Sequence, residues 1–573
     1  MTKTQEMLTR GTACLAVILL AGIDFRFSIL DFRFKSEIGN RKSEISVPSK
    51  VELYGVHEVV FSGPTCGPLD NPAAEMDLVT EWCHESGQPT YRINGFWDGD
   101  GRGGASGNVF KVRFCPTMLG KWTLVRTSSN KPELHAQREG YAILCIPSGN
   151  KGFWEVDKEA VQGRWYKRSD GSHPYIVGNT MYSFLSEYRD SGPTGGNIAA
   201  DIEGNSQYFK KVRFSITADR YPHPKDKPFL DKSGKPTDNG NFSHRPNPAW
   251  FYHRVDLAVK LAYETDLIAD LILNGPDTKD SRSVLQAAEN SGDCTAILKY
   301  IAARYGSYPN VWICLSNEFD IKDPKYTASD IAKFGCTIRQ FLPYPTPVSV
   351  HSSSRDWLAQ LNTDPSWNNH ITLQKKIKNL PIAADFVARN FWIGGANKPV
   401  IDDELAYEGK GDGFSEQDVI EAHLGAFLGG GYGTTGCKPA NKKGHYFYGN
   451  FKASEHQSAD NLLWLRQMID ENITFWKMAP THDSDSSDDG TSIFDNIHQD
   501  FRALEWFGHE YVLGTNKKHQ DIRARLPEGQ WRISCYDVIG KTQRILASRA
   551  TGTFNFDAPD SRAVMFHLKK REK

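Results

Sequence analysis

The sequence predicts an α/β protein in which a (β/α)8 barrel is flanked by an N-terminal and a C-terminal β-sandwich domain. Between about residues 150 and 480, short apolar runs alternate with helical periods, and two of these runs end in a glutamate, Glu318 and Glu404. A buried strand excludes charge, but the C-terminal rim of such a barrel is where functional side chains lie. On either side, β-rich runs follow one another with turn residues about ten positions apart, as is typical of sandwiches.

The length of 573 residues is enough for three or four domains. Lys3 and Arg10 precede the apolar run 13–23, which is long enough for the hydrophobic region of a signal peptide and too short for a membrane span. We therefore expect a secreted or periplasmic bacterial protein without a membrane span. The expected segments are a leader with a low-complexity stretch at 1–50, an N-terminal β-sandwich at 51–148, a catalytic (β/α)8 barrel at 149–480 and a C-terminal β-sandwich at 481–573.

The barrel is predicted from eight strand candidates in about 330 residues, which suits a (β/α)8 fold with enlarged loops. Between the strands, 250–262 and 294–305 place apolar residues at i, i+3, i+4 and i+7, as amphipathic helices do. The polar stretch 221–249 is the expected long loop after the second strand, and loops of this length are functional or disordered. The expected strands are 174–179, 211–216, 267–273, 310–315, 347–351, 370–374, 399–402 and 425–432.

The flanking segments carry shorter β-rich runs. The acidic stretch 483–490 is expected to be a solvated turn or linker, because a calcium loop places ligands at alternate positions and adds a later bidentate glutamate. The expected strands are 51–54, 76–82, 91–97, 109–114 and 120–125 in the N-terminal sandwich, and 510–515, 521–526, 530–537 and 563–568 in the C-terminal sandwich.

The composition excludes several function classes. The net charge is −1, so no global field favours nucleic acid or an anionic membrane. The chain contains no H-E-x-x-H zinc motif, Walker loop or G-x-S-x-G esterase motif. Its ten cysteines form no C-x-x-C pair, and Cys83 and Cys115 either pair with each other or are buried free thiols. We expect no nucleic-acid partner, no metal site and no cofactor.

Two carboxylates at two strand ends are what retaining glycoside hydrolysis requires, one as acid/base and one as nucleophile. Glu318 follows Asn317 at the end of the fourth strand and is the expected acid/base. Glu404 closes an Asp-Asp-Glu run on the seventh strand, where period-two alternation places Asp402 and Glu404 on one face and Asp403 on the other. Glu404 lies furthest toward the rim and is the expected nucleophile, with Asp403 as the second choice.

The nucleophile must remain ionised, which requires hydrogen-bond donors beside it. Arg213 on the second strand and Tyr432 on the eighth are the candidates, and the alternative for Arg213 is an ordinary salt bridge at a strand end. His351 and Gln374 end the fifth and sixth strands at the same rim. His351 either is a satisfied structural histidine or contacts the substrate or Glu404.

Two aromatic residues, Trp392 and Tyr407, are candidate stacking walls for a sugar ring, with core packing as the equal alternative. Glu408 lies in the loop that follows the seventh strand. We expect it to cap local structure rather than to react.

Motifs in the barrel region resemble a known family. The nine residues at 305–313, Tyr-Gly-Ser-Tyr-Pro-Asn-Val-Trp-Ile, and the five at 247–251, Asn-Pro-Ala-Trp-Phe, resemble apiosidase-like, DUF4038-type glycoside hydrolases with clan-A-like TIM barrels. The resemblance spans 150–480 and implies that Asn317 binds the 2-hydroxyl of the sugar in the −1 subsite. Asn179 on the first strand is expected at the same subsite. Similar sequences often have an acidic residue in its place, so we expect different sugar contacts here.

The flanking domains also resemble known modules. The motifs at 71–72, 95–99 and 110–114 are similar to the DUF5060-type β-sandwich that precedes many bacterial hydrolase barrels. The last segment resembles a collagen-binding-type β-sandwich, and we expect it to pack against the barrel.

Together these features predict a retaining glycoside hydrolase with a carbohydrate substrate, either a polysaccharide or its side chains. The two carboxyl groups are then expected about 5 to 5.5 Å apart, whereas about 8 Å would indicate inversion. The alternative is a non-catalytic carbohydrate-binding or surface protein on a decayed barrel, in which Glu318→Ala would change nothing. A peptidase is not supported, because the chain has no recognisable nucleophile or zinc motif.

Overall fold

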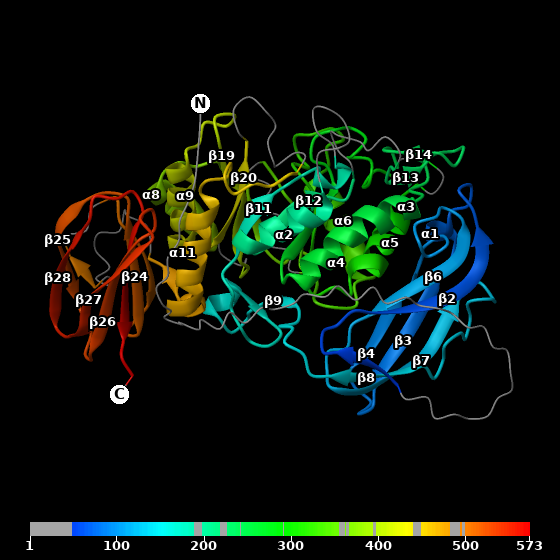
Figure 1. Cartoon of the computed structure of the whole chain (residues 1–573), viewed down its shortest axis with the longest axis horizontal. Helices are drawn as coiled ribbons and strands as arrows, with labels where there is room; N and C mark the ends of the chain where they lie inside the picture. The colour runs from blue at the N-terminus through cyan, green and yellow to red at the C-terminus, as the bar shows by residue number, and fades with distance from the viewer. Residues whose placement is uncertain are drawn as a thin grey trace, which may run out of the picture. The chain divides into compact units, whose positions relative to one another are not determined.

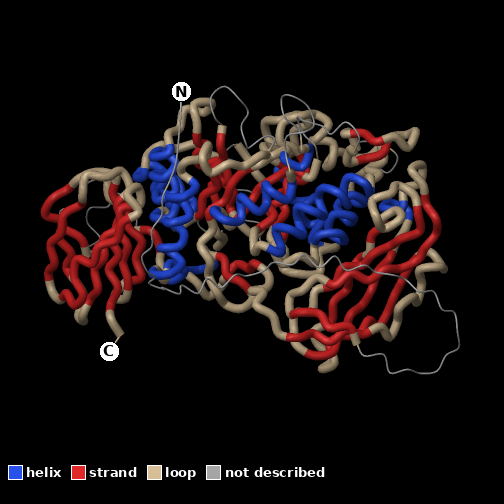
Figure 2. Tube along the Cα trace, in the orientation of Figure 1, coloured by secondary structure: helices blue, strands red, loops and turns tan. Residues whose placement is uncertain are grey.

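The computed structural model describes residues 48–187, 197–217, 226–240, 242–289, 292–353, 361, 366–392, 397–438, 449–481, 493–495 and 499–572 (Figures 1 and 2). The predicted leader before residue 48 and the acidic turn at 483–490 lie outside these ranges, as do 221–225 and 241 of the predicted long loop. None of the described helices combines the length and the apolar character that a membrane span requires.

Eight parallel strands form the central barrel (Figure 1). The first, β11, pairs with both β12 and the last strand, β20, so the sheet curves back on itself. All residues of these strands are buried, as expected for a parallel sheet covered by helices. This arrangement confirms the predicted fold class. The strands are β11 (Val177–Thr180), β12 (Lys211–Ser215), β15 (Ile268–Asn274), β16 (Val311–Ser316), β17 (Val348–Ser349), β18 (Ile371–Leu373), β19 (Val400–Glu408) and β20 (Tyr432–Cys437).

The barrel has a seam between β17 and β18, which the strand pairing leaves at the two ends of the sheet. The Val348 N–H donates to Oδ1 of Asn369 over 2.8 Å, and the Asn369 N–H donates to the Val348 carbonyl over 2.9 Å. The guanidinium of Arg339 also donates to Asn369 Oδ1. The side chain and the N–H group of Asn369 therefore stand in for a ladder of hydrogen bonds at this position.

Helices cover the outside of the barrel (Figure 2). Two of them begin with a capping box, in which the side chains of Thr327 and Asp330, or of Ser415 and Asp418, satisfy free N–H groups of the first turn. The helices are α2 (Ile198–Tyr208), α3 (Pro248–Trp250), the π-helical η3 (Phe251–Val255), α4 (Asp256–Glu264), α5 (Thr295–Tyr305), α6 (Ala328–Arg339), α8 (Leu380–Phe391), α9 (Glu416–Leu428) and α11 (Ala459–Asn472).

The predicted eighth strand, 425–432, is wrong. The first half of this segment is the end of α9, and β20 begins at its last residue, Tyr432. The end of α9 is buried all round, so its apolar run has no helical period to distinguish it from a strand. Gly425 and Gly429 allow α9 to pack closely on α8, because a Cβ at either position would lie 2.4 Å from a carbonyl oxygen of that helix.

The N-terminal region forms two sheets, in the orders β1-β8-β7-β3-β4 and β2-β6-β5. Between them, Trp82 stacks on Phe114 with ring centroids 4.3 Å apart. Cys83 and Cys115 are both free thiols, so the alternative of a disulfide is excluded. The prediction did not include β2 and β8. The strands are β1 (Ser49–Glu52), β2 (His57–Cys66), β3 (Leu78–His84), β4 (Thr90–Asn94), β5 (Phe96–Trp97), β6 (Gly107–Phe114), β7 (Gly120–Ser129) and β8 (Ala142–Ile146).

The C-terminal region also forms two sheets, in the orders β21-β23-β24-β29-β26-β27 and β22-β25-β28. Their inner faces enclose a core that includes Trp531 and Phe566. The strands are β21 (Ala479–Pro480), β22 (Phe494–Asp495), β23 (Arg502–Trp506), β24 (Glu510–Thr515), β25 (His519–Arg525), β26 (Trp531–Asp537), β27 (Thr542–Ala550), β28 (Thr553–Ala558) and β29 (Val564–Lys570).

A buried group of charges joins the N-terminal strands to the barrel helices. Arg113 of β6 and Arg304 of α5 both pair with Asp256 of α4, at 2.6 and 2.7 Å. Arg304 and Lys111 also pair with Asp98, each at 2.8 Å, and the side chain of Asp98 is fully buried. Buried cations are tolerated only when paired in this way.

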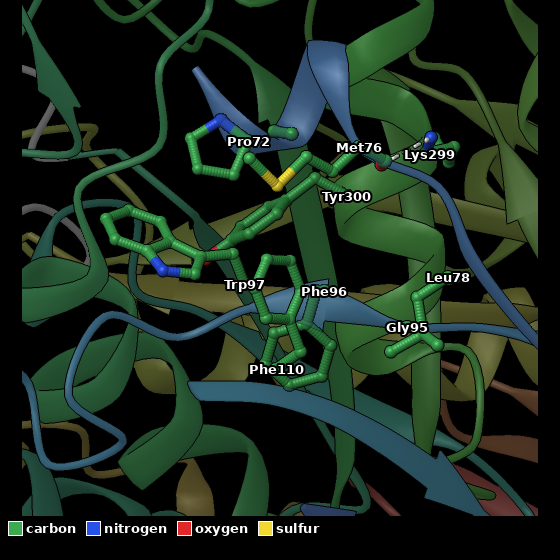
Figure 3. Close-up of a pocket in the computed structure, with 10 residues that line it drawn as sticks. Pro72, Met76, Leu78, Gly95, Phe96, Trp97, Phe110, Lys299 and Tyr300 are labelled. Carbon is green, nitrogen blue, oxygen red and sulfur yellow. Dashed lines mark hydrogen bonds between the residues drawn. The ribbon is translucent and has the colours of Figure 1, made fainter. Parts of the chain in front are cut away.

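A small apolar pocket lies where the N-terminal strands meet α5 (Figure 3). Phe96, Trp97 and Phe110 form one wall, and Tyr300 of α5 forms another. The Lys299 ammonium donates to the Met76 carbonyl over 3.4 Å at its edge. None of the polar groups predicted to act on a substrate lines this pocket, so we regard it as a packing imperfection of the junction.

We predict that Asp256→Asn lowers the free energy of unfolding by about 3 kcal/mol at pH 7, because two buried guanidinium groups lose their carboxylate. Burial raises the pKa of Asp256, but Arg113 and Arg304 outweigh it and hold the pKa well below its usual range. The contribution is therefore complete above the unfolded pKa of about 3.9 and is lost as the pH falls through the lower folded value. Urea denaturation at pH 7 and at pH 3 measures this.

The matched control is Lys260→Gln, which removes an exposed pair with Glu264 at 4.0 Å and is expected to cost less than about 0.5 kcal/mol. A loss for Asp256→Asn no larger than that of the control, or one that does not shrink at pH 3, would contradict the proposed role of the buried pair.

Candidate active site

Glu318 and Glu404 lie close together at the C-terminal side of the barrel. Glu318 stands two residues beyond β16, and Glu404 lies on β19. The side-chain amide of Gln374, which follows β18, donates to Glu318 Oε1 over 2.7 Å and to Glu404 Oε2 over 3.4 Å. Since one nitrogen contacts both, these two carboxylate oxygens lie within about 6 Å of each other.

Glu404 is held by a buried tyrosine. The Tyr182 hydroxyl donates to Glu404 Oε1 over 2.6 Å and accepts a hydrogen bond from Arg213 over 3.1 Å. Burial raises the pKa of Glu404, whereas the Tyr182 hydrogen bond and the Arg213 charge oppose this rise and the nearby Glu318 adds to it. Arg213 thus acts on the carboxylate through the tyrosine hydroxyl.

Asn317 is the second group that Arg213 organises. Its Oδ1 accepts from Arg213 Nη2 and from His351 Nδ1, each over 2.6 Å. Two donors on the oxygen direct the amide nitrogen of Asn317 away from them, as a donor for another group. Burial, and then the Arg213 charge, hold the pKa of His351 well below its usual value, so the ring is neutral and its Nε2 is an acceptor.

Glu318 is the more accessible of the two carboxylates. Its side chain is 13 % exposed and lies 3.4 Å from the Lys322 ammonium, which also pairs with Asp277 at 3.1 Å. A carboxyl group between the site and the solvent can exchange protons with a departing group and with water.

The neighbouring aspartates have structural partners. Asp403 pairs with Lys211 inside the barrel and accepts from Thr434 over 2.7 Å. Asp402 accepts from two backbone N–H groups, one of them that of Glu404. The period-two alternation that was expected to place Asp402 and Glu404 on one face of the strand is wrong. The pairing of β19 with β20 shifts register after Asp402, and this shift is a β-bulge.

The pKa of Asp403 is shifted in the opposite direction from that of Glu404. Burial raises its pKa, but Lys211 and Arg213 outweigh this effect and hold the pKa well below its usual range. Lys211 and Thr434 hold the carboxylate of Asp403 inside the barrel, so Asp403 is not the group that faces Glu318.

Glu408 is the last residue of β19 rather than part of the following loop, but its expected capping role is confirmed. Its two carboxylate oxygens accept from the backbone N–H groups of Gln457 and Ser458, over 2.7 and 2.8 Å, immediately before α11. A carboxylate at this end of a helix satisfies free donors and favours the helix dipole.

Tyr407 also lies at the site. It is buried, and its hydroxyl lies 3.2 Å from that of Tyr182. The Lys376 ammonium lies 4.6 Å from the centre of its ring. Tyr407 therefore helps to position Tyr182 and the base of the site.

Three of the residues predicted for substrate binding lie elsewhere. Asn179 donates to Asn205 of α2 over 2.7 Å, outside the barrel wall. Tyr432 begins β20 at the opposite end of the barrel, where its hydroxyl accepts from the Tyr166 N–H over 3.1 Å. Trp392 follows the last residue of α8, before β19 starts, and so also lies at that opposite end. These three residues lie away from Glu318 and Glu404 because of where they stand along their strand or helix, not because their side chains are unsuited to binding a sugar.

Two residues at the site were missed. Tyr182 follows the first strand by two residues. It lies in a segment without a periodic pattern, so nothing in the sequence indicated that it belongs to the site. Lys322 stands four residues after Glu318, a spacing that brings side chains together in a helical turn and could have indicated the contact. Among the described residues, no group of His, Cys, Asp and Glu side chains could hold a metal ion.

Two family models match the chain. Residues 50–130 match the domain of unknown function DUF5060, and residues 205–445 match the apiosidase-like catalytic domain. These parts of the chain are therefore similar to an apiosidase-like catalytic domain and to a DUF5060 domain, as the sequence motifs predicted. A search of curated proteins found no match.

Solved structures share the fold at low sequence identity. A candidate glycoside hydrolase from Bacteroides vulgatus is 22% identical, with a TM-score of 0.67 over 91% of this chain and 100% of that chain. A family 5 glycoside hydrolase from the same species is 14% identical, with a TM-score of 0.56 over 74% and 94%. A third structure, described as a glycoside hydrolase, is 15% identical, with a TM-score of 0.54 over 74% and 98%.

We predict that Tyr182→Phe moves the acidic limb of the pH dependence of kcat/KM upward by about one pH unit. The reason is that a hydrogen bond to a charged group contributes about 1.5–3 kcal/mol and one pKa unit about 1.4 kcal/mol. The hydroxyl stabilises ionised Glu404, so its removal raises the pKa of Glu404 further. The limb is measured by initial rates between pH 4 and pH 8.

Tyr175→Phe is the matched control. The hydroxyl of Tyr175 is also buried, but it donates to the Gly431 carbonyl at the opposite end of the barrel. An unchanged limb in Tyr182→Phe, or the same shift in both variants, would contradict the role assigned to Tyr182.

Proposed function

We propose that the protein is a retaining glycoside hydrolase that cleaves O-glycosidic bonds in a polysaccharide or its side chains. The observation that carries this proposal is the contact of one Gln374 nitrogen with both Glu318 and Glu404. The resulting limit of about 6 Å between one oxygen of each carboxylate suits the separation of about 5 to 5.5 Å between carboxyl groups in retaining enzymes. The apiosidase-like catalytic domain supports a glycosidase.

In this proposal Glu404 is the nucleophile. Its carboxylate attacks the anomeric carbon and forms a glycosyl-enzyme ester, while the bond to the leaving oxygen breaks. Tyr182 holds Oε1 over 2.6 Å, whereas Oε2 has the longer contact of 3.4 Å with Gln374 and is the oxygen that forms the new bond. Burial keeps water away from the carboxylate and raises its pKa, so the enzyme requires a pH high enough to ionise it.

Glu318 is the acid/base. It donates a proton to the leaving oxygen in the first step and becomes a carboxylate. In the second step this carboxylate takes a proton from water, whose oxygen attacks the anomeric carbon and releases Glu404. The greater exposure of Glu318 supports this role, because both the leaving group and water must reach it.

Asn317 is the proposed sugar-binding group. Arg213 and His351 occupy its carbonyl oxygen, so its NH2 group is left to donate to the 2-hydroxyl of the sugar in the −1 subsite. Such hydrogen bonds strengthen in the transition state.

The signal-peptide-like start of the chain supports a secreted or periplasmic location, where polysaccharides are available.

The test starts with a panel of plant and microbial polysaccharides and 4-nitrophenyl glycosides, followed by variants on the substrate that is cleaved. We predict that Glu404→Gly and Glu318→Ala lose at least about 1,000-fold in kcat, and that sodium azide restores both on an aryl glycoside whose leaving group departs without a proton. Azide takes the place of the nucleophile in Glu404→Gly, which yields a glycosyl azide of inverted configuration. In Glu318→Ala it attacks the ester intermediate, which yields the retained configuration.

The anomer released by the wild-type protein, followed by NMR, is an independent check. Release of the inverted anomer would exclude the retaining mechanism. Full activity of Glu318→Ala on every substrate of the panel, or glycan binding without any release of sugar, would instead support a non-catalytic carbohydrate-binding protein.

A further inference from the structure

Glu318 has an unusual backbone. Its φ is +46°, in the left-handed region that residues with a side chain rarely adopt. This conformation costs about 1–3 kcal/mol unless surrounding contacts impose it. Directly after it, the N–H groups of Ile321 and Lys322 both donate to the Glu318 carbonyl, which closes a tight turn. The direction of the Glu318 side chain therefore depends on whatever holds this turn.

Arg282 holds the turn. It lies in the segment that follows β15 and is fully buried, with none of its surface exposed. Each of its guanidinium nitrogens donates to main-chain carbonyl groups, two of them within 3.1 Å. The acceptors are the carbonyls of Pro276 at 3.3 Å, Asn317 at 2.7 Å, Glu318 at 3.5 Å, Lys322 at 3.2 Å, Asp323 at 3.1 Å and Pro324 at 3.5 Å.

The geometry requires a cation at this point. Several carbonyl dipoles turn their negative ends toward one another, and they repel unless a positive group lies between them. A planar guanidinium can contact many of them at once, which an ammonium cannot do. Gly275 leaves the necessary room, because a Cβ there would lie 3.1 Å from Arg282 Nη1 and 3.2 Å from Asn317 Cβ.

We propose that Arg282 is a positioning residue for the acid/base: it imposes the left-handed backbone of Glu318 and so aims its carboxyl group at the leaving oxygen. This inference rests on the proposed function, in which Glu318 is the acid. Arg282 contacts neither Glu404 nor the carboxyl group of Glu318 in the hydrogen bonds described above. Its loss therefore weakens protonation of the leaving group while attack by Glu404 continues.

The test uses two aryl glycosides of the sugar that the wild-type protein releases. A 2,4-dinitrophenolate departs without a proton, whereas phenol requires one, so only the phenyl glycoside depends on a correctly placed acid. We expect Arg282→Met to reduce kcat/KM for the phenyl glycoside about 100-fold and for the dinitrophenyl glycoside less than about 3-fold. Arg282→Lys keeps the charge and is expected to fall between Arg282→Met and wild type.

A second variant and a matched control separate positioning from general damage. Gly275→Ala crowds Arg282 and Asn317 and is expected to show the same dependence on the leaving group. Arg168→Lys is the control. Arg168 is also buried, but it donates to the Gly152 carbonyl and pairs with Asp266, away from Glu318 and Glu404. It is expected to lose stability without any change in leaving-group dependence.

Hydrogen exchange provides a measurement that does not depend on activity. In Arg282→Lys we expect the amide protons of Ile321 and Lys322 to exchange at least about 10-fold faster than in wild type, and in Arg168→Lys at the wild-type rate. Equal losses on both glycosides, or unchanged exchange at these amides, would overturn the proposal. If Glu318→Ala itself does not discriminate between the glycosides, the proposed function fails, and the exchange result alone decides whether Arg282 holds the turn.

Discussion

The buried guanidinium of Arg213 connects the two halves of the candidate site. It donates to Asn317, beside Glu318, and to Tyr182, which in turn donates to Glu404. A charge so deep in the barrel is tolerated because Asp403 and Lys211 form a paired layer directly next to it. Loss of one member of such a group leaves an uncompensated buried charge, which costs several kcal/mol. The position of both carboxylates and the stability of the barrel thus depend on the same electrostatic balance.

The barrel itself was predictable, because buried parallel strands are apolar along their whole length and end abruptly. The failures have the same origin. A helix that is buried all round is also apolar along its whole length, so the end of α9 was predicted as the eighth strand. That single displacement moved Tyr432 from the start of β20 to its predicted end, and with it to the wrong side of the barrel.

The site was predictable only where a strand end determines the position of a residue. His351 and Gln374 follow from this rule, and they contact Asn317 and the carboxylates. Arg213 lies in the middle of β12, and its long side chain reaches Asn317. Tyr182 lies in a segment without periodicity, so its contact with Glu404 exists only in three dimensions. Arg282 was harder to predict than Tyr182, because its partners are main-chain carbonyl groups. Every residue has such a group, so no sequence motif can indicate these contacts.

The seam of the barrel has a consequence for the candidate site. At every other pair of neighbouring strands a ladder of main-chain hydrogen bonds joins the two, whereas among the described residues β17 and β18 are joined through Asn369. His351 and Gln374 follow the ends of these two strands. The strand pair with the fewest hydrogen bonds among the described residues therefore lies beside the carboxylates, because Gln374 contacts both Glu318 and Glu404.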